Sequence, residues 1–163
     1  MVPQTAGKKN LNQDISKIIM LNVNIQSKVN EWSQRLSLLS GMDRLEYIFG
    51  LAQLLDTVPE SYKQDQFLIP GCVSRLWLIP KYDTHTLTLM ADAEAQITKG
   101  ITHIVLDILG NQSYEALSNI ELKDFTALGF AQLITPQRQN GLGSLILTIR
   151  HYAELNAKSC HSS

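Results

Sequence analysis

The stretch "SRLWLIPKYDTHTLTLMA", from Ser74 to Ala91, determines the fold class. Its first part is rich in residues that favour β-strands, and its last part alternates apolar with less apolar side chains. The apolar members of that alternation are Leu87, Leu89 and Ala91. Between the two parts lies the polar segment Pro80–Asp83, which suits a turn. The stretch therefore predicts an antiparallel hairpin with one face packed against helices.

Helical periodicity occurs on both sides of this hairpin. Apolar residues recur at helical spacing over 25–39, 45–55, 93–109 and 142–153, and a shorter helical stretch is predicted over 121–128. Gly41 is expected to end the first helix and Asp43 to cap the second, while Thr135 and Pro136 form a start signal for the last. Because helices and strands are segregated along the chain, we predict an α+β fold with a small antiparallel sheet of about three strands flanked by helices.

Composition narrows the class of protein. A chain of 163 residues, 44% hydrophobic and 18% charged, fits one globular domain. The formal net charge of -1 provides no broad basic field that would attract nucleic acid or an anionic membrane. The apolar runs fall well short of the roughly 18 residues of a membrane span, and no signal-peptide pattern is present. We expect a soluble, cytoplasmic protein with neither nucleic-acid nor membrane partners.

The domain organisation is predicted to be simple. Residues 1–23 are polar apart from a short apolar patch, and we interpret them as a flexible N-terminal extension. The periodic segments fall within 24–157, which forms the domain. Residues 158–163 are a polar tail that contains Cys160, to which we assign no role.

The loop before the hairpin contains Cys72, the more informative of the two cysteines. A free cysteine is often a small buried hydrophobe, but the preceding Pro70-Gly71 pair indicates a turn, and turns usually lie at the surface. A reactive thiol would also need a nearby cation or a helix N-terminus to favour the thiolate. Arg75 is close in sequence, although side chains three apart across a loop-to-strand transition need not meet. The sequence leaves a buried thiol and a functional thiol open.

The histidines give little support for a metal site or for a catalytic pair with Cys72. With two cysteines and no C-x-x-C or H-x-x-x-H spacing, the sequence does not favour a metal site. A thiol-dependent hydrolase would need folding to bring a histidine beside Cys72. The candidate histidines are His85, His103 and His151. We keep this enzyme as the alternative function.

Two glycines, Gly141 and Gly143, fall in the first turns of the last predicted helix. Each costs about 1 kcal/mol there relative to alanine, so their presence needs a reason. Tight packing against another element is one explanation. The other is that the helix start, with Arg138, must lie close to another backbone or an anionic group.

Three segments in this order resemble the SufE-like activators of cysteine desulfurases. They are "IPGCVSRLWL" from Ile69, "ADAEAQITKGI" from Ala91 and "LITPQRQNGLGSLILTIR" from Leu133. The family pattern is approximately V-x-G-C-x-S-x-V-W, then D-S-D-A-x-I-x-K-G, then L-[ST]-P-S-R-x-x-G-L. The resemblance extends from about Ile25 to Tyr152, and it departs from the pattern at Leu76, Ala93 and Glu94.

The resemblance implies a SufE/IscU-like fold and a sulfur acceptor that is not itself an enzyme. Such a protein binds a pyridoxal-phosphate-dependent cysteine desulfurase, takes persulfide sulfur onto the loop cysteine, here Cys72, and stimulates the desulfurase. The sulfur then passes to scaffold proteins of iron–sulfur cluster assembly. No cofactor or metal of its own is implied, and the sequence leaves a homodimer open.

The same resemblance indicates which residues serve the site. The loop around the cysteine is expected to contact the partner through Pro70, Gly71, Val73, Ser74 and Arg75. Supporting roles fall to Glu94, Arg138 and Gly141. Gly71 is expected to give the loop its freedom to move.

Overall fold

The computed structural model describes residues 6–157, with backbone only for 6–11, 14 and 17–23. The helices are α1 (Ala6–Ser37), α2 (Gly41–Leu51), α3 (Gln96–Leu109), α4 (Tyr114–Ser118) and α5 (Pro136–Ala157). The strands are β1 (Leu76–Tyr82), β2 (Thr86–Ala93) and β3 (Gln112–Ser113). Short 3₁₀ turns join them: η1 (Ala52–Leu54), η2 (Glu60–Tyr62), η3 (Asp65–Phe67), η4 (Leu122–Leu128) and η5 (Phe130–Gln132).

The sheet has the strand order β1-β2-β3, and both strand pairs are antiparallel. Leu78 lies opposite Ala91, and Ile79 lies opposite Met90. Because side chains alternate along a strand, this register places Leu76, Leu78, Leu87, Leu89, Ala91 and Ala93 on one face. That face belongs to the main core, so the predicted α+β class, antiparallel hairpin and buried alternation are confirmed. The predicted turn at Pro80–Asp83 is wrong, because β1 continues to Tyr82 and the turn lies at 83–85. The edge position of β1 in the sheet tolerates Pro80 within the strand.

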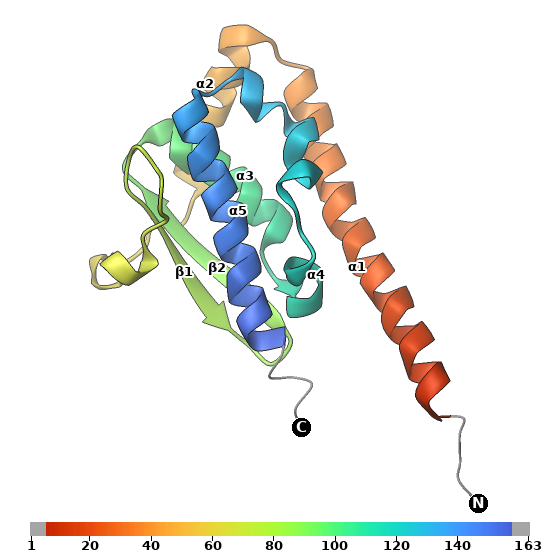
Figure 1. Ribbon diagram of the computed structural model, residues 1–163. Helices are drawn as coiled ribbons and strands as arrows, with labels where there is room; N and C mark the ends of the chain where they lie inside the picture. The colour runs from red at the N-terminus through yellow and green to blue at the C-terminus, as the bar shows by residue number, and fades with distance from the viewer. Residues whose placement is uncertain (1–5, 158–163) are drawn as a thin grey trace, which may run out of the picture.

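Helices cover this face of the sheet (Figure 1), where α5 crosses in front of β1 and β2 and α3 lies beside it. The core joins sheet residues to fully buried side chains of α3 and α5 such as Ile104, Ile108 and Ile146. Burying each such side chain stabilises the fold by about 1.5–3 kcal/mol. The sheet and α5 therefore form two packed layers, and the segment before β1 lies at one end of them.

The other face of the sheet carries a smaller apolar cluster. Trp77 and Ile79 pack there with Val58, and Phe67, Leu68 and Met90 contact them. Trp77 and Trp32 are both buried, which confirms their predicted place in the core. The chain from Val58 to Leu68 thus covers the hairpin from behind and leads directly into the cysteine loop.

Helix α1 begins earlier than the sequence indicated. We predicted a helix starting near Ile25, but α1 starts at Ala6 and ends at Ser37. The buried residues Ile25, Val29, Trp32 and Leu36 carry the predicted stripe. The predicted flexible extension over 1–23 therefore has helical backbone from Ala6 onward, and the domain boundary at 24 stays a prediction. Residues 1–5 and the predicted tail 158–163, with Cys160, lie outside the described residues.

Helix α2 starts at Gly41, so the predicted cap at Asp43 is wrong. The N-cap is Ser40, and Gly41 adopts the left-handed φ of 50° inside the helix start rather than ending α1. Helices α2 and α3 meet at Gly100, where a Cβ would lie 1.9 Å from the carbonyl oxygen of Ile48. Only glycine permits this approach, because any side chain would push the two helices apart.

The start of α5 agrees with its sequence signal. Pro136 is the first helical residue, and the Thr135 hydroxyl accepts a long, 3.4 Å hydrogen bond from the Arg138 amide. The helical stretch predicted over 121–128 is the 3₁₀ turn η4, with a capping box between Glu121 and Asp124.

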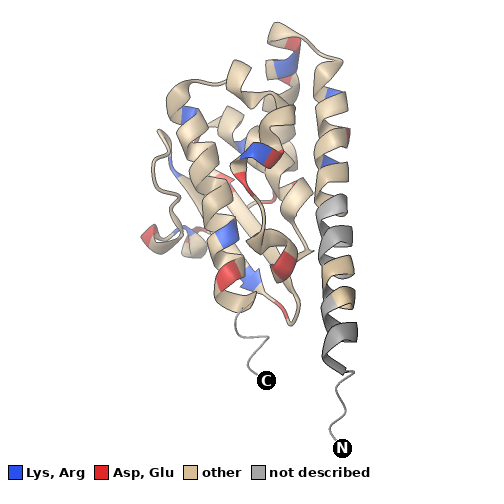
Figure 2. Ribbon diagram, turned by 45° about the vertical axis from the view of Figure 1, so that its right-hand side comes forward, with Lys and Arg blue, Asp and Glu red and all other residues tan. Residues whose placement is uncertain are grey.

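No helix in the described part of the chain has the length and apolar character needed to cross a membrane. Acidic and basic residues are interspersed in the view of Figure 2.

Candidate functional site

Cys72 lies at the tip of the short loop between η3 and β1. The base of the loop is closed by backbone contacts, since the Ile69 amide donates to the Leu76 carbonyl at 2.8 Å and Leu68 bridges to Trp77. Between these anchors Gly71 has a φ of 78°, a left-handed conformation that side chains disfavour. The loop therefore turns back on itself at Gly71 and directs the next residue inward.

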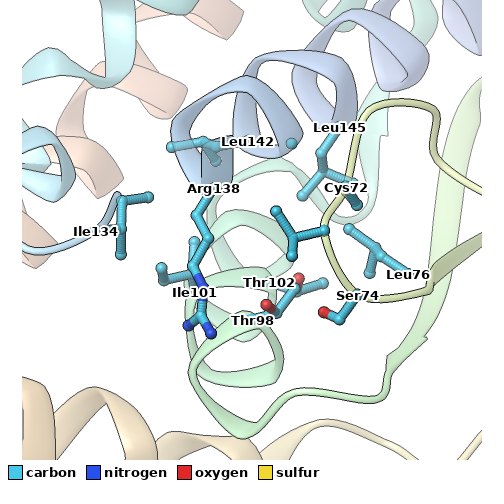
Figure 3. Close-up of a pocket in the computed structure, with 12 residues that line it drawn as sticks. Cys72, Ser74, Leu76, Thr98, Ile101, Thr102, Ile134, Arg138, Leu142 and Leu145 are labelled. Carbon is cyan, nitrogen blue, oxygen red and sulfur yellow. The ribbon is translucent and has the colours of Figure 1, made fainter. Parts of the chain in front are cut away.

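The half-buried Cys72 side chain lines a small pocket between the loop, α3 and α5 (Figure 3). The other lining residues are Val73, Ser74, Leu76, Thr98, Ile101, Thr102, Ile134, Arg138, Gly141, Leu142 and Leu145. The free space in the pocket is about 30 Å³, whereas one water-sized atom needs roughly 10–15 Å³. The pocket thus has room for an atom or two beside the sulfur, but not for a molecule the size of an amino acid.

Gly141 makes this arrangement possible. A Cβ built on Gly141 would lie 2.8 Å from Cys72 Sγ and 3.5 Å from its Cα. Of the two explanations for this glycine, tight packing is the one with a contact to support it, and the packed partner is the cysteine itself. Gly143 is different, because a Cβ there would be 3.6 Å from its nearest neighbour, a methyl group of Leu122.

The environment of Cys72 favours the neutral thiol. Burial raises the pKa of the Cys72 thiol above its ordinary value, and no nearby charge contributes to that shift. Arg75, the cation close to Cys72 in sequence, therefore does not supply a stabilising charge in this conformation. A thiol with a raised pKa has less of the nucleophilic thiolate at a given pH than an exposed cysteine.

Arg75 is instead paired with Glu94 across the ends of β1 and β2. The Arg75 guanidinium contacts Glu94 Oε1 at 2.8 Å through Nε and 2.5 Å through Nη2, and the Glu94 amide donates to the Arg75 carbonyl at 3.0 Å. The side-chain hydrogen bond from Arg75 is the main cause that lowers the pKa of Glu94. The guanidinium also lies 5.3 Å from the centre of the Trp77 ring. This exposed pair fixes the point at which the cysteine loop enters the sheet.

Arg138 lines the pocket from α5, as predicted, but it does not reach the sulfur. Figure 3 shows its guanidinium turned toward Thr98 and Ile101 of α3 and away from Cys72. Among the described residues, Arg138 has no acidic side chain within ion-pair distance. It therefore presents an uncompensated positive charge at the side of the pocket.

The remaining predicted residues lie in three places. Pro70 and Val73 are exposed at the loop tip, and the Val73 side chain is 71% exposed. Ser74 lines the pocket. Glu94 lies beside Arg75 and is not among the residues that line the pocket, so its place is at the root of the loop.

Sequence reasoning missed the apolar wall of the pocket and one charged cluster. Thr98 and Thr102 had a signal, since two hydroxyl side chains four apart share one face of α3. The cluster is centred on the buried Asp92, which contacts Lys63 Nζ at 2.9 Å and Lys99 Nζ at 3.3 Å. Burial alone would raise the pKa of Asp92, but hydrogen bonds from Lys63, from the Ala93 amide and from Lys99 together lower it.

The alternative catalytic arrangement is not assembled. No histidine of the described chain lines the Cys72 pocket. His103 makes an edge contact with the Trp32 ring, whose Nε1 donates to Asp107, and His151 is exposed on α5. Within 6–157 no group of three His, Cys, Asp or Glu side chains could hold a metal ion. The geometry therefore gives the hydrolase alternative no support.

Comparison with known families gives a match over most of the chain. The family model described as "SufE: Fe-S metabolism associated domain" matches residues 30–153. An uncharacterized SufE-like protein of Rhizobium meliloti (strain 1021) is 31% identical over 121 residues, which cover 69% of this chain and 84% of that protein. An uncharacterized SufE-like protein of Rhizobium etli is 27% identical over 124 residues, covering 71% and 81%.

Two further similarities extend this comparison. A chloroplastic quinolinate synthase of Nicotiana tabacum is 28% identical over 110 residues, which are 66% of this chain but only 14% of that protein. The solution structure of a hypothetical protein from Thermus thermophilus superimposes with a TM-score of 0.66. It covers 83% of this chain and 97% of its own at 15% identity, so it supports the fold alone.

Proposed function

We propose that this chain, which belongs to the SufE family of Fe-S metabolism associated domains, accepts sulfur on Cys72 from a cysteine desulfurase. Its role lies in iron–sulfur metabolism, and within that role it acts as an activator and not as the enzyme that releases the sulfur. The observation that carries the proposal is the half-buried Cys72, held against Gly141 beside a space of about 30 Å³.

The chemistry is a thiol exchange. The Cys72 thiolate attacks the outer sulfur of a persulfide on the desulfurase, a bond forms between that sulfur and Sγ, and the sulfur–sulfur bond of the donor breaks. The donor cysteine leaves as a thiolate and takes up the proton that Cys72 gave up. One thiol and one persulfide enter and one thiol and one persulfide leave, so no oxidant is needed.

The pocket suits the product of this reaction. A persulfide on Cys72 adds one atom beyond Sγ, and the pocket that Cys72 lines has free space for an atom or two of about the size of water. The pocket is lined largely by apolar side chains such as Ile101, Leu142 and Leu145. These apolar side chains would keep thiols and oxidants dissolved in the solvent away from the outer sulfur until the sulfur is transferred to the next protein.

Loading requires the loop to open. In the closed conformation the thiol is half-buried and its pKa is raised by burial, both of which oppose attack. We therefore propose that desulfurase binding moves the loop from Pro70 to Ser74 outward, with Gly71 as the hinge. Hydrogen exchange at 71–74 should change when the desulfurase is added, and an unchanged rate would rule out this movement.

The other residues take roles around that movement. Pro70, Val73, Ser74 and Arg75 contact the desulfurase, while Gly141 provides the space that Cys72 occupies. Glu94 holds Arg75 at the root of the loop, and Arg138 supplies positive charge at the pocket. The loaded protein delivers sulfur to scaffold proteins of iron–sulfur cluster assembly, and we place both steps in the cytoplasm.

Intact-protein mass spectrometry tests the proposal. The chain is incubated with a purified cysteine desulfurase, pyridoxal phosphate and free cysteine, and the mass is measured with and without a reductant. We expect a reducible addition of one sulfur atom on the wild type and on Cys160→Ser. The same addition on Cys72→Ser, or none on the wild type, would contradict the assignment.

A further inference from the structure

An apolar groove lies next to the Cys72 pocket. Its walls come from α2, from the first turn of α3 and from the segment that leads into α5, at the end of the molecule where α2 meets α5 in Figure 1. The lining residues are Met42, Leu45, Glu46, Phe49, Gly50, Ile97, Leu133, Ile134, Thr135 and Arg138. The open space in the groove is about 550 Å³, many times that of the Cys72 pocket.

The groove exposes large apolar side chains to water. Met42 is 67% exposed and Phe49 is 56% exposed, although both lie on the helix that contributes the buried Ile48 to the core. Contiguous exposed apolar surface with a polar rim commonly marks a site where another protein binds. The rim here consists of Glu46 on α2 and Thr135 and Arg138 at the start of α5.

The groove and the Cys72 pocket are continuous. Ile134 and Arg138 line both of them, so a segment lying in the groove would reach the side of the pocket. On the other side of the pocket Val73 exposes a further apolar side chain beside Cys72. The apolar surface therefore extends from the α2 helix to the loop tip, with the pocket between them.

Interface size argues that the loop cannot bind a desulfurase alone. A stable protein–protein complex buries about 800 Å² on each partner, involving some 20–30 residues a side. The loop from Pro70 to Arg75 is too short to supply that area, so the interface must extend onto the neighbouring surface. The groove adjoins the pocket and exposes large apolar side chains such as Met42 and Phe49.

We propose that this groove is the docking site for an apolar segment of the desulfurase that carries a carboxylate. The inference rests on the proposed function and names where its partner binds. The apolar part of the segment covers Met42, Leu45 and Phe49, in the way that helices and extended peptides fill hydrophobic grooves. Its carboxylate pairs with Arg138, whose charge has no acidic partner among the described residues. Glu46 on the α2 side of the groove is likewise without an ion-pair partner in that part of the chain, so the carboxylate must lie on the α5 side. Docking there brings the partner's persulfide to the loop.

Phe49→Glu and Met42→Glu test the groove against a matched control, Leu147→Glu. Leu147 is 60% exposed on a helix, like Phe49, but it does not line the groove. Binding of each full-length variant is measured by calorimetry with the desulfurase used for the loading experiment. We expect at least a tenfold increase in Kd for both groove variants, because charging an anchor residue removes its apolar contact. The Kd of Leu147→Glu should stay within twofold of wild type.

A second measurement separates docking from sulfur chemistry. Sodium polysulfide needs no docking site, so it should load Cys72 in Phe49→Glu as fast as in the wild type, while enzymatic loading slows. If Phe49→Glu binds the desulfurase with unchanged Kd, the groove proposal is wrong even where wild-type loading stands. If the wild type binds but is not loaded, the proposed function fails while the Kd comparison still decides on the groove.

The same variants also test whether a second copy of this chain occupies the groove. Sedimentation of the wild type and of Phe49→Glu would then show a dimer that becomes a monomer, with desulfurase affinity unchanged. That result would assign the groove to self-association and overturn the docking proposal. Equal sedimentation of both proteins, together with the expected loss of desulfurase affinity, supports it.

Discussion

The sulfur of Cys72 occupies the space that a side chain at Gly141 would fill, since a Cβ there would lie 2.8 Å from Sγ. A contact this short cannot be made by a real Cβ, so either the loop or the helix would have to shift. The position of the Cys72 thiol therefore depends on the absence of a side chain at Gly141, which lies on α5. This relationship makes the pocket sensitive to a single added methyl group.

Gly141→Ala is expected to push Cys72 outward. The added Cβ overpacks the contact at a cost of about 1–3 kcal/mol, which offsets the roughly 1 kcal/mol that alanine gains over glycine in a helix. The rate of Cys72 alkylation by iodoacetamide, measured in a Cys160→Ser background, should rise severalfold. Gly143→Ala is the control, because its Cβ would meet nothing closer than 3.6 Å. Equal alkylation rates in the two variants would contradict the packing argument.

Gly71→Ala should destabilise the loop without affecting the core. A left-handed backbone costs a residue with a side chain about 1–2 kcal/mol, and Gly71 has a φ of 78°. Gly41→Ala carries a similar backbone penalty at a φ of 50°, with no atom within 4 Å of the new Cβ. Urea unfolding should show comparable losses for both, whereas desulfurase-dependent loading should slow only for Gly71→Ala. Equal loading rates would remove Gly71 from the proposed hinge.

Cys72 should titrate above an ordinary thiol in the folded protein. Burial favours the neutral form, so the pKa of Cys72 is raised and less thiolate is present at any given pH. The pH profile of alkylation, again without Cys160, should have a higher midpoint in buffer than in denaturing urea. Saturating desulfurase should move that midpoint down if docking opens the loop. A folded profile that coincides with the unfolded one would mean that the thiol is not shielded.

Asp92→Asn should remove part of the pH dependence of stability. Because the folded pKa of Asp92 is lowered, its contribution is present above the unfolded value of about 3.9 and is lost as the pH falls through the folded value. We expect the variant to be about 2–3 kcal/mol less stable at pH 6, somewhat below the cost of breaking a fully buried pair. This difference should shrink below about pH 4.

The control for Asp92→Asn is an exposed ion pair whose N···O distance is similar to that between Lys63 and Asp92. Arg150 Nε lies 2.8 Å from Glu154 Oε1, and both side chains are 40% exposed. Glu154→Gln should change stability by less than about 1 kcal/mol at pH 6. A loss in Glu154→Gln as large as that in Asp92→Asn would show that burial of Asp92 does not strengthen its contacts. Chemical denaturation between pH 3 and pH 7 measures all three proteins.

The two strands and their buried face were predictable from the alternation of the second strand, whereas the turn was not, because residues 80–82 continue β1. A slip by one residue would move Leu87, Leu89 and Ala91 out of the core, so the local pattern determines both the strands and the buried face. The start of α5 was equally local, since Thr135 and Pro136 act within one turn. The start of α1 was not, because a helix nucleated by packing at Ile25 and Val29 continues into polar residues at little cost per residue.

The site was predictable only at its centre. Turn chemistry at Pro70 and Gly71 indicated the loop, and the resemblance indicated Cys72. The contact of Cys72 with Gly141 and the apolar pocket wall depend on how α3 and α5 pack, which no local pattern determines. The partner of Arg75 was unpredictable for the same reason, because Glu94 is its neighbour in space but not in sequence.

The contact between Gly100 and Ile48 has a consequence for molecular recognition. This contact packs α2 closely against α3, and both helices contribute to the walls of the groove beside Cys72. A partner would therefore meet a preorganised surface and lose little conformational entropy on that side. Only the cysteine loop would need ordering at the moment of encounter. If the desulfurase docks as we propose, the rigid groove would contribute most of the affinity and the mobile loop would transfer the sulfur.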